Sequence, residues 1–316
     1  MLSYIARRLL ISLPVLLGIT VINFILMKLA PGNPVDMLID PNTPPELLQA
    51  KKAMLGLNSP PAVQYGKWLL GLLHGHLGYS FSSYAPVADL IAQRIGPTLL
   101  LAFASLFGGM LIALPLGIAG AVRRNTALDH ALTGLSFVGI SLPPFFLGLG
   151  LIYWFSLKTK LLPTGGMHTL GGEGGLGDAL YHLVLPASVL AAAIVGKKIR
   201  YIRASMLDVL EKEYLRTARA KGVRESLVIG KHALRNALLP ILTVFGAEIP
   251  VLLGGSILVE QIFQWPGIGQ LALQSILSRD YPTLMALNLV AAIVVLASNL
   301  LTDALYTMAD PRIQYR

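Results

Sequence analysis

Long stretches without a charged side chain decide what this chain can fold into. Residues 98–122 and 131–157 carry no charge, and each exceeds the roughly 20 apolar residues that a helix needs to cross a bilayer. Four more apolar stretches lie at residues 9–27, 180–196, 237–259 and 281–303. With 54% hydrophobic and only 13% charged residues, the 316-residue chain does not resemble an ordinary soluble domain. We therefore predict an all-α integral membrane protein with six transmembrane helices.

The basic residues are spread unevenly over the connections between these stretches. If the N-terminus lies in the cytoplasm, the inner segments hold 17 of the 25 lysines and arginines and the outer segments hold 7. Inner loops of membrane proteins are enriched in lysine and arginine. We therefore expect a multi-pass protein with both termini in the cytoplasm. The net charge of +9 is read as a topology signal and not as a nucleic-acid-binding surface.

The N-terminal third differs in character from the rest. Residues 9–27 are longer than the apolar region of a secretory signal, so we expect an uncleaved first span. Prolines and a glycine within residues 31–34 cannot continue that helix. The more polar part up to residue 97 predicts a small external lobe with short helices. The expected organisation is a first helix with its lobe in residues 1–97 and a five-helix core in residues 98–316.

The most polar and basic segment of the chain, residues 206–240, lies between the fourth and fifth spans. At helical spacing, an apolar stripe is formed by Met206, Leu210, Tyr214 and Ala218, and a basic face by Lys212, Arg216 and Arg219. Gly222 follows and ends the predicted helix, because glycine readily adopts the dihedral angles of a helix terminus. A short amphipathic helix between two spans is typical of a part that a soluble partner binds.

This segment resembles the cytoplasmic "EAA" loop of permease subunits of binding-protein-dependent ABC importers. The dipeptide, oligopeptide and nickel branch carries Tyr-x-Arg-Thr-Ala-x-Ala-x-Gly, then His-x-Leu-Arg-Asn and Leu-Pro, which are found here at residues 214–222, 232–236 and 239–240. The general family has Glu-Ala-Ala where this chain has Arg216-Thr217-Ala218. Further motifs of the branch match residues 30–34, 54–57, 77–80, 260–269 and 310–312. The resemblance covers essentially the whole chain.

The resemblance implies the type I ABC importer permease fold in a bacterial-type cytoplasmic membrane. It implies a second, homologous permease subunit, two cytoplasmic ATPases, an extracytoplasmic substrate-binding protein and surrounding membrane lipid. ATP and magnesium would bind to the ATPases, and this chain would carry no cofactor. The residues expected to dock on an ATPase are Glu213, Tyr214, Arg216, Thr217, Ala218, Arg219, Lys221 and Gly222. Those expected to shape an external gate are Glu260, Phe263, Trp265, Pro266 and Gly267, with Trp265 as an interfacial anchor.

Polar and helix-breaking residues inside the spans are candidates for the translocation path. An ionised Glu248 facing lipid would cost on the order of a few kcal/mol, so this side chain is expected to face the interior or to be protonated. Asn288 and Asn299 of the last span are candidate neighbours in the path. Pro143 and Pro144 must kink or break the third span. Each of these features is also compatible with helix packing alone.

The solute, and functions of other classes, are the remaining alternatives. Dipeptides or oligopeptides are the first expected solute, with nickel chelates and glutathione as alternatives within the branch. A proton-coupled secondary transporter working through Glu248 is the alternative from another class, although no repeat between the halves supports it. His74 and His76 supply too few ligands for a metal site. The chain has no His-Glu-x-x-His, Gly-x-Ser-x-Gly or Gly-Lys-Ser/Thr motif, so no catalytic residue is predicted and ATP is expected on another chain.

Overall fold

The computed structural model describes residues 2–29, 44–54, 56–172 and 174–309 of the chain. Secondary structure in these ranges is helical, apart from an isolated bridge between Tyr79 and Pro86. The chain forms two compact units, Met1–Thr98 with Pro266–Leu296 and Leu99–Trp265 with Ala297–Arg316. The predicted motifs at residues 30–34 and 310–312 fall outside the described residues.

The first unit contains the first helix, the lobe that follows it and part of the C-terminal region. Its helices are α1 (Leu2–Leu29), α2 (Pro45–Met54), α3 (Pro61–Leu73), the start of α4 (Val87–Val122), α12 (Ile268–Leu277) and most of α13 (Tyr281–Ala309). A small apolar core joins Val87 and Ile91 of α4 to Leu271, Ala286 and Leu287. α3 has no buried residue.

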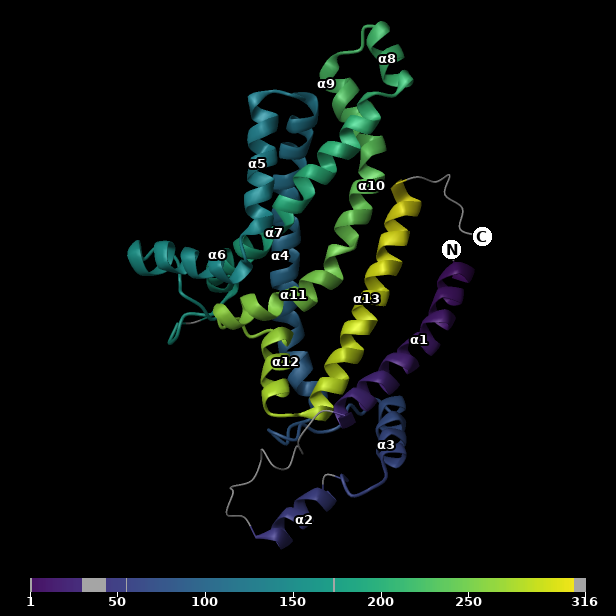
Figure 1. Ribbon diagram of the computed structural model, residues 1–316, viewed down its shortest axis with the longest axis vertical. Helices are drawn as coiled ribbons and strands as arrows, with labels where there is room; N and C mark the ends of the chain where they lie inside the picture. Colours follow the sequence, from purple (N-terminus) through teal and green to yellow (C-terminus); the bar gives the residue numbers. More distant parts are fainter. Residues whose placement is uncertain (1, 30–43, 55, 173, 310–316) are drawn as a thin grey trace. The chain divides into compact units, whose positions relative to one another are not determined.

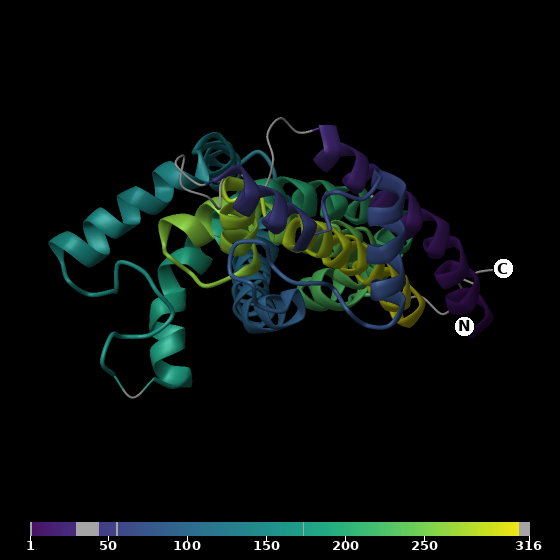
Figure 2. The same cartoon turned by 90° about the horizontal axis from the view of Figure 1, so that it is seen from below.

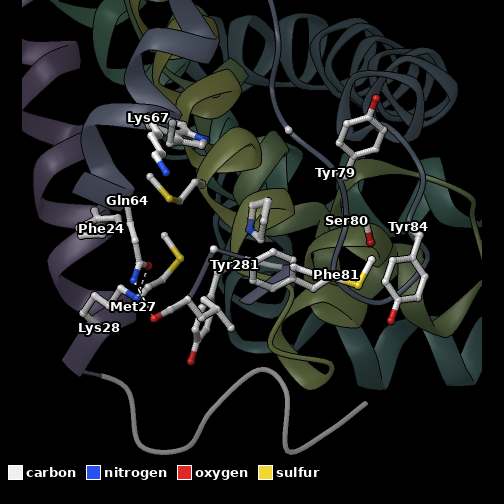
Figure 3. Close-up of a pocket in the computed structure, with 17 residues that line it drawn as sticks. Phe24, Met27, Lys28, Gln64, Lys67, Tyr79, Ser80, Phe81, Tyr84 and Tyr281 are labelled. Atoms are coloured by element: carbon white, nitrogen blue, oxygen red, sulfur yellow. Dashed lines mark hydrogen bonds between the residues drawn. The ribbon is translucent and has the colours of Figure 1, made fainter. Parts of the chain in front are cut away.

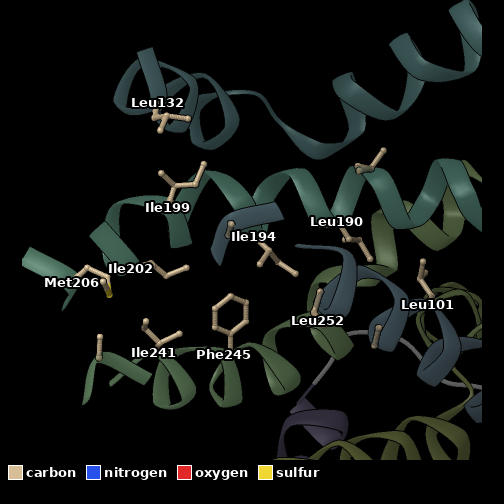
Figure 4. Close-up of a cluster of buried hydrophobic side chains, with 14 of the residues drawn as sticks. Leu101, Leu132, Leu190, Ile194, Ile199, Ile202, Met206, Ile241, Phe245 and Leu252 are labelled. Carbon is tan, nitrogen blue, oxygen red and sulfur yellow. The ribbon is translucent and has the colours of Figure 1, made fainter. Parts of the chain in front are cut away.

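The second unit is built around α7, a helix of 35 residues. Its helices are the rest of α4, α5 (Ala127–Ser141), α6 (Pro144–Leu151), η2 (Ile152–Lys158), α7 (Leu176–Leu210), α8 (Glu213–Ala220), α9 (Glu225–Leu227), η3 (Val228–Ala233), α10 (Leu234–Gly246), α11 (Glu248–Ile262) and the end of α13. Figure 4 shows Ile202 and Met206 of α7 lying opposite Ile241 and Phe245 of α10. Burial of these side chains fixes α7 between α5 and α10.

The number of apolar helices agrees with the six predicted spans. Among the described residues, α1, α4, α7 and α13 are each long and apolar enough to cross a membrane. Two bent helix pairs raise the count to six if each pair forms one span. The first pair is bent by 97° between Ser141 and Pro144, where the double proline was predicted to break the helix (Figure 1).

The geometry of this break follows from the two prolines. Pro143 adopts extended dihedrals (φ −60°, ψ 135°) and precedes α6, whose first residue is Pro144. A proline is well accommodated in the first turn of a helix, because its missing N–H would have no intrahelical partner there. α6 packs against α7 and α11, and η2 continues from it as one arm that projects from the second unit (Figure 2).

α5 packs against α7 at a pair of glycines. A Cβ atom built on Gly196 of α7 would lie 3.0 Å from the carbonyl carbon of Gly139 in α5, which leaves no room for a side chain. Small residues at such points let two membrane helices approach closely. This contact sets Gly139 and Gly196 at the same level along the two helices.

The predicted amphipathic helix in the loop is shorter than expected. α7 continues through Met206 and ends at Leu210, and α8 begins only at Glu213. Lys212 is extended (φ −71°, ψ 143°), so it interrupts the helix that was expected to run from Met206 to Lys221. Met206 is buried as part of α7 and Leu215 as part of α8, so the residues of the predicted helix are divided between two helices.

Candidate functional site

α8 is the part of the predicted docking segment that stands on the surface. Leu215 is fully buried in the core of the second unit and Ala218 packs against the same core. The side chain of Asn236 in α10 donates a hydrogen bond to the hydroxyl of Tyr214, over 2.9 Å. Leu215 and Ala218 thus hold α8 to its own chain, whereas Tyr214 stays exposed beside them.

The exposed face of α8 is polar and basic. Glu213, Tyr214, Arg216, Thr217, Arg219, Lys221 and Gly222 are all exposed. The Arg219 guanidinium donates hydrogen bonds of 2.8 and 3.0 Å to the Glu225 carboxylate, which raise the pKa of Arg219. Arg216 and Lys221 have no carboxylate partner among the described residues. These two cations are therefore available to an acidic surface.

Gly222 ends α8 in the way the sequence predicted. Its φ of +75° lies in the left-handed region, where a side chain is strained. The N–H of Gly222 donates to the carbonyl of Arg219 and that of Val223 to the carbonyl of Ala218. This pair of bonds is the Schellman motif, which satisfies the last carbonyls of a helix.

Glu248 lies in the interior of the second unit, where it pairs with a lysine. The distance between Glu248 Oε1 and Lys198 Nζ is 2.5 Å, and the side chains are 11% and 5% exposed. Lys198 also donates a hydrogen bond of 3.0 Å to the carbonyl of Val244. The carboxylate is thus compensated by Lys198 of α7, which in the sequence is only one of several basic residues that follow the fourth apolar stretch.

The other residues proposed for the path lie in different surroundings. Asn288 donates a hydrogen bond of 2.9 Å to the side chain of Asn23 in α1, within the first unit. Asn299 and Pro143 are exposed and Pro144 is half-buried. Their role in a path stays a prediction.

The predicted external gate turn follows α11. Glu260 and Phe263 are buried, and the N–H of Trp265 donates to the carbonyl of Glu260 over 2.8 Å. The expectation that Trp265 anchors the protein in the membrane interface is wrong, because its side chain is fully buried in the core. Pro266 and Gly267 lead from this turn into α12.

The connector that precedes α7 packs against this turn and holds it in place. The N–H of Gly166 donates to the carbonyl of Phe263 over 2.7 Å. A Cβ atom on Gly165 would collide with that same carbonyl oxygen, so a larger residue does not fit there. His182 of α7, which is buried, contacts the carbonyl of Gly165 through Nδ1 at 3.0 Å.

Asp280 joins the lobe to α13 within the first unit and was not singled out from the sequence. Its carboxylate is buried and accepts hydrogen bonds from the Ser80 hydroxyl (2.5 Å), the Phe81 N–H (2.9 Å) and the Thr283 hydroxyl (2.8 Å). The hydroxyl of Ser82 donates a further, longer bond of 3.2 Å. These bonds tie the lobe segment that follows Gly78 to the start of α13.

We expect the replacement Asp280→Asn to lower the free energy of local opening of this segment by about 2 kcal/mol, since hydrogen bonds to a charged group contribute about 1.5–3 kcal/mol. Amide hydrogen exchange at residues 80–85 would then accelerate roughly thirtyfold. The matched control is Asp89→Asn, which removes an exposed carboxylate at the start of α4. Equal exchange rates in the two variants would contradict the anchoring role.

A cavity of about 330 Å³ lies beside this anchor in the first unit (Figure 3). Phe24, Met27 and Lys28 of α1 line it together with Lys67 of α3 and Tyr281 of α13. Lys28 donates a hydrogen bond of 2.7 Å to the Gln64 side chain. The aromatic side chains near the end of α1 are of the kind that gather at a membrane interface. No group of three or more possible metal ligands occurs among the described residues.

Two protein families match the chain and together cover almost all of it. Residues 113–315 match the family described as "Binding-protein-dependent transport system inner membrane component", and residues 1–102 match the N-terminal family of the same systems. The chain belongs to this family of inner-membrane transport components. The resemblance inferred from the loop and turn motifs is thereby confirmed.

Two characterised relatives match the permease from end to end. It is 45% identical over 320 residues to the oligopeptide transport system permease protein AppB of Bacillus subtilis, with 100% of both chains covered. It is 39% identical over 316 residues to the glutathione transport system permease protein GsiC of Salmonella typhimurium, again with 100% of both chains covered. The permease is thus similar to complete subunits of peptide and glutathione transport systems.

Solved structures confirm the fold. An inward-facing structure of the MetNI methionine ABC transporter matches with a TM-score of 0.59 at 17% identity, covering 70% of the permease and 97% of that chain. A structure of an amino acid ABC transporter matches with a TM-score of 0.54 at 18% identity, covering 70% and 94%. The permease therefore has the helical fold of ABC importer membrane subunits.

Proposed function

We propose that this permease forms part of the membrane path of an ATP-driven importer for short peptides. The observation that carries the proposal is its end-to-end similarity to an oligopeptide permease at 45% identity. Glutathione is the second candidate solute, because a glutathione permease matches at 39% over the same length. Glutathione is itself a small peptide-like molecule, so both candidates fall within one chemical class.

The coupling loop supplies the proposed link to ATP. α8 presents Arg216 and Lys221 on its exposed face, and its buried Leu215 holds it to the core. We assign this face to a cleft with acidic residues on a cytoplasmic ATPase, since complementary charges orient such contacts. A movement of the ATPase would then reach α7 and α10, which flank the loop. A second permease subunit and an external binding protein complete the proposed assembly.

This assignment places both termini and α8 in the cytoplasm. The bias of lysine and arginine toward the segments on that side supports the orientation. Proton-coupled transport through Glu248 is not favoured, because its carboxylate already pairs with Lys198 in the interior. A carrier that takes up and releases protons needs a carboxyl group that can reach water.

Peptide uptake by the reconstituted importer tests the proposal. We expect a labelled dipeptide to accumulate in vesicles that contain the permease with the subunits that accompany it and the binding protein, when ATP is supplied. Depletion of ATP should abolish uptake, whereas a proton uncoupler should leave it unchanged. Labelled glutathione measured in parallel distinguishes the two candidate solutes. Uptake that follows the proton gradient and ignores ATP would contradict the assignment.

A further inference from the structure

A groove between α5 and α7 carries an unusual combination of side chains. Its volume is about 650 Å³, which falls within the range of ligand-binding cavities. Phe137 and Ile140 of α5 form one wall, and Lys197, Arg200 and Tyr201 of α7 form the other. All five side chains are exposed in the chain. The groove is thus apolar on one side and cationic on the other.

The positive charge of the groove is not fully compensated by the described residues around it. Arg203, at one end, is neutralised by Asp129 through hydrogen bonds of 2.5 and 2.7 Å. The Arg200 guanidinium lies 4.8 Å from the centre of the Phe137 ring, a cation–π contact that leaves its charge in place. Lys197 has no ion-pair or hydrogen-bond partner among the described residues. Two positive charges therefore face the groove, and no described carboxylate lines it.

The groove lies near the cytoplasmic end of the apolar part of α7. Residues 179–196 contain no Asp, Glu, Lys or Arg, and at about 1.5 Å per residue they approach the roughly 30 Å of the hydrocarbon core. Lys197 is the first charged residue beyond them, and Arg203 lies about 9 Å further along the helix. The contact between Gly139 and Gly196 sets Ile140 at this same level. Gly117 of α4 packs against Ile202, and the uncharged stretch of α4 runs on to Val122, so Lys197 and Arg200 lie one to two helical turns inside the edge of the apolar spans. From there long basic side chains reach the lipid headgroups.

We propose that this groove binds an anionic phospholipid of the cytoplasmic leaflet, with its phosphate between Lys197 and Arg200. Its acyl chain lies along Phe137 and Ile140, which are 53% and 44% exposed without it. Basic pockets between membrane helices on the cytoplasmic side bind anionic headgroups in this way. A peptide carboxylate would match the charges but would leave the apolar wall in water. The choice of leaflet rests on the topology given under the proposed function.

Lipid retention by the purified importer tests this site. The complex is extracted from membranes containing phosphatidylglycerol and phosphatidylcholine, and bound lipids are counted by native mass spectrometry. We expect phosphatidylglycerol to be retained, and the double variant Lys197→Gln/Arg200→Gln to bind it about thirtyfold more weakly. Each basic residue near an anionic surface contributes roughly a fivefold factor. The charge-preserving variant Lys197→Arg/Arg200→Lys should retain the lipid and shows that the groove still folds.

A matched control removes the same charge elsewhere on the same side. Arg123→Gln/Lys231→Gln takes two exposed basic residues from outside the groove and should leave lipid retention unchanged. Equal retention in the control and the groove double variant would overturn the proposal. So would a photoreactive group at position 140 that labels peptide or the second permease and not lipid. The measurement needs neither ATP nor solute, so its failure leaves the importer assignment standing.

Discussion

Replacing Lys198 with methionine is expected to destabilise the second unit by about 3–5 kcal/mol, because the variant leaves the Glu248 carboxylate buried without its cation. The pair is nearly enclosed, with the two side chains 5% and 11% exposed. Glu248→Leu should cost a comparable amount, since it strands the Lys198 ammonium in the same place. Thermal unfolding of the purified complex in detergent measures both losses.

The double variant Lys198→Met/Glu248→Leu separates a structural pair from a transport residue. Replacing both charges by apolar groups of similar volume is often nearly neutral, so most of the stability should return. ATP-driven peptide uptake should return with it. A double variant that folds but has lost uptake would show that the charges themselves take part in transport.

The control for this cycle is an ion pair on the surface. Arg124 contacts Glu211 at 3.0 Å, but the side chains are 55% and 68% exposed. Such pairs contribute under about 1 kcal/mol, so Arg124→Met should change the unfolding temperature little. If Lys198→Met and Arg124→Met both unfold at the wild-type temperature, the buried Lys198–Glu248 pair does not stabilise the protein more than a surface pair does.

Features set by local chemistry could be predicted from the sequence. The double proline at residues 143–144 leaves a helix no way to continue straight, and the structure bends by 97° there. Gly222 was expected to end a helix, and it adopts the positive φ that other residues avoid. The apolar stretches are long enough to identify spans without knowing their neighbours. In each case the decisive interaction lies within a few residues along the chain.

Features that depend on distant residues could not be predicted. Lys198 looks like one more basic residue at a cytoplasmic boundary, and only packing of α7 against α10 and α11 brings it to Glu248. The position of Glu248 in an apolar span does indicate that its carboxylate needs a cationic partner, but it does not identify that partner. Trp265 shows the same limit: a tryptophan near a span end suits an interface, yet this one is buried.

The helix in the loop depends both on local sequence and on contacts with distant residues. The helical spacing from Met206 to Ala218 is real, but Met206 and Leu215 are both buried in the core, and the chain breaks between them at Lys212. Periodicity identifies an apolar side without saying what covers it. The face left for a partner is therefore polar, and charge complementarity must carry more of the contact than the sequence indicated.

Gly222→Val is expected to abolish most ATP-driven uptake while the protein is still made and inserted. The left-handed conformation costs an L-residue roughly 1–2 kcal/mol, and more for a β-branched side chain. The turn after α8 would relax to another conformation and carry Arg216 and Lys221 away from their positions. We expect uptake to fall at least about tenfold, which corresponds to about 1.4 kcal/mol.

Gly230→Val is the matched control for this variant, because it makes the same chemical change within the same loop. Gly230 lies in η3 with no positive φ, and a Cβ atom there meets nothing within 4 Å. The control should transport at nearly the wild-type rate, and both variants should retain ATP hydrolysis. Normal uptake in Gly222→Val at normal expression would contradict the proposed loop geometry. Equal loss in both variants would show sensitivity to bulk in the loop, and the turn conformation would then not be the cause.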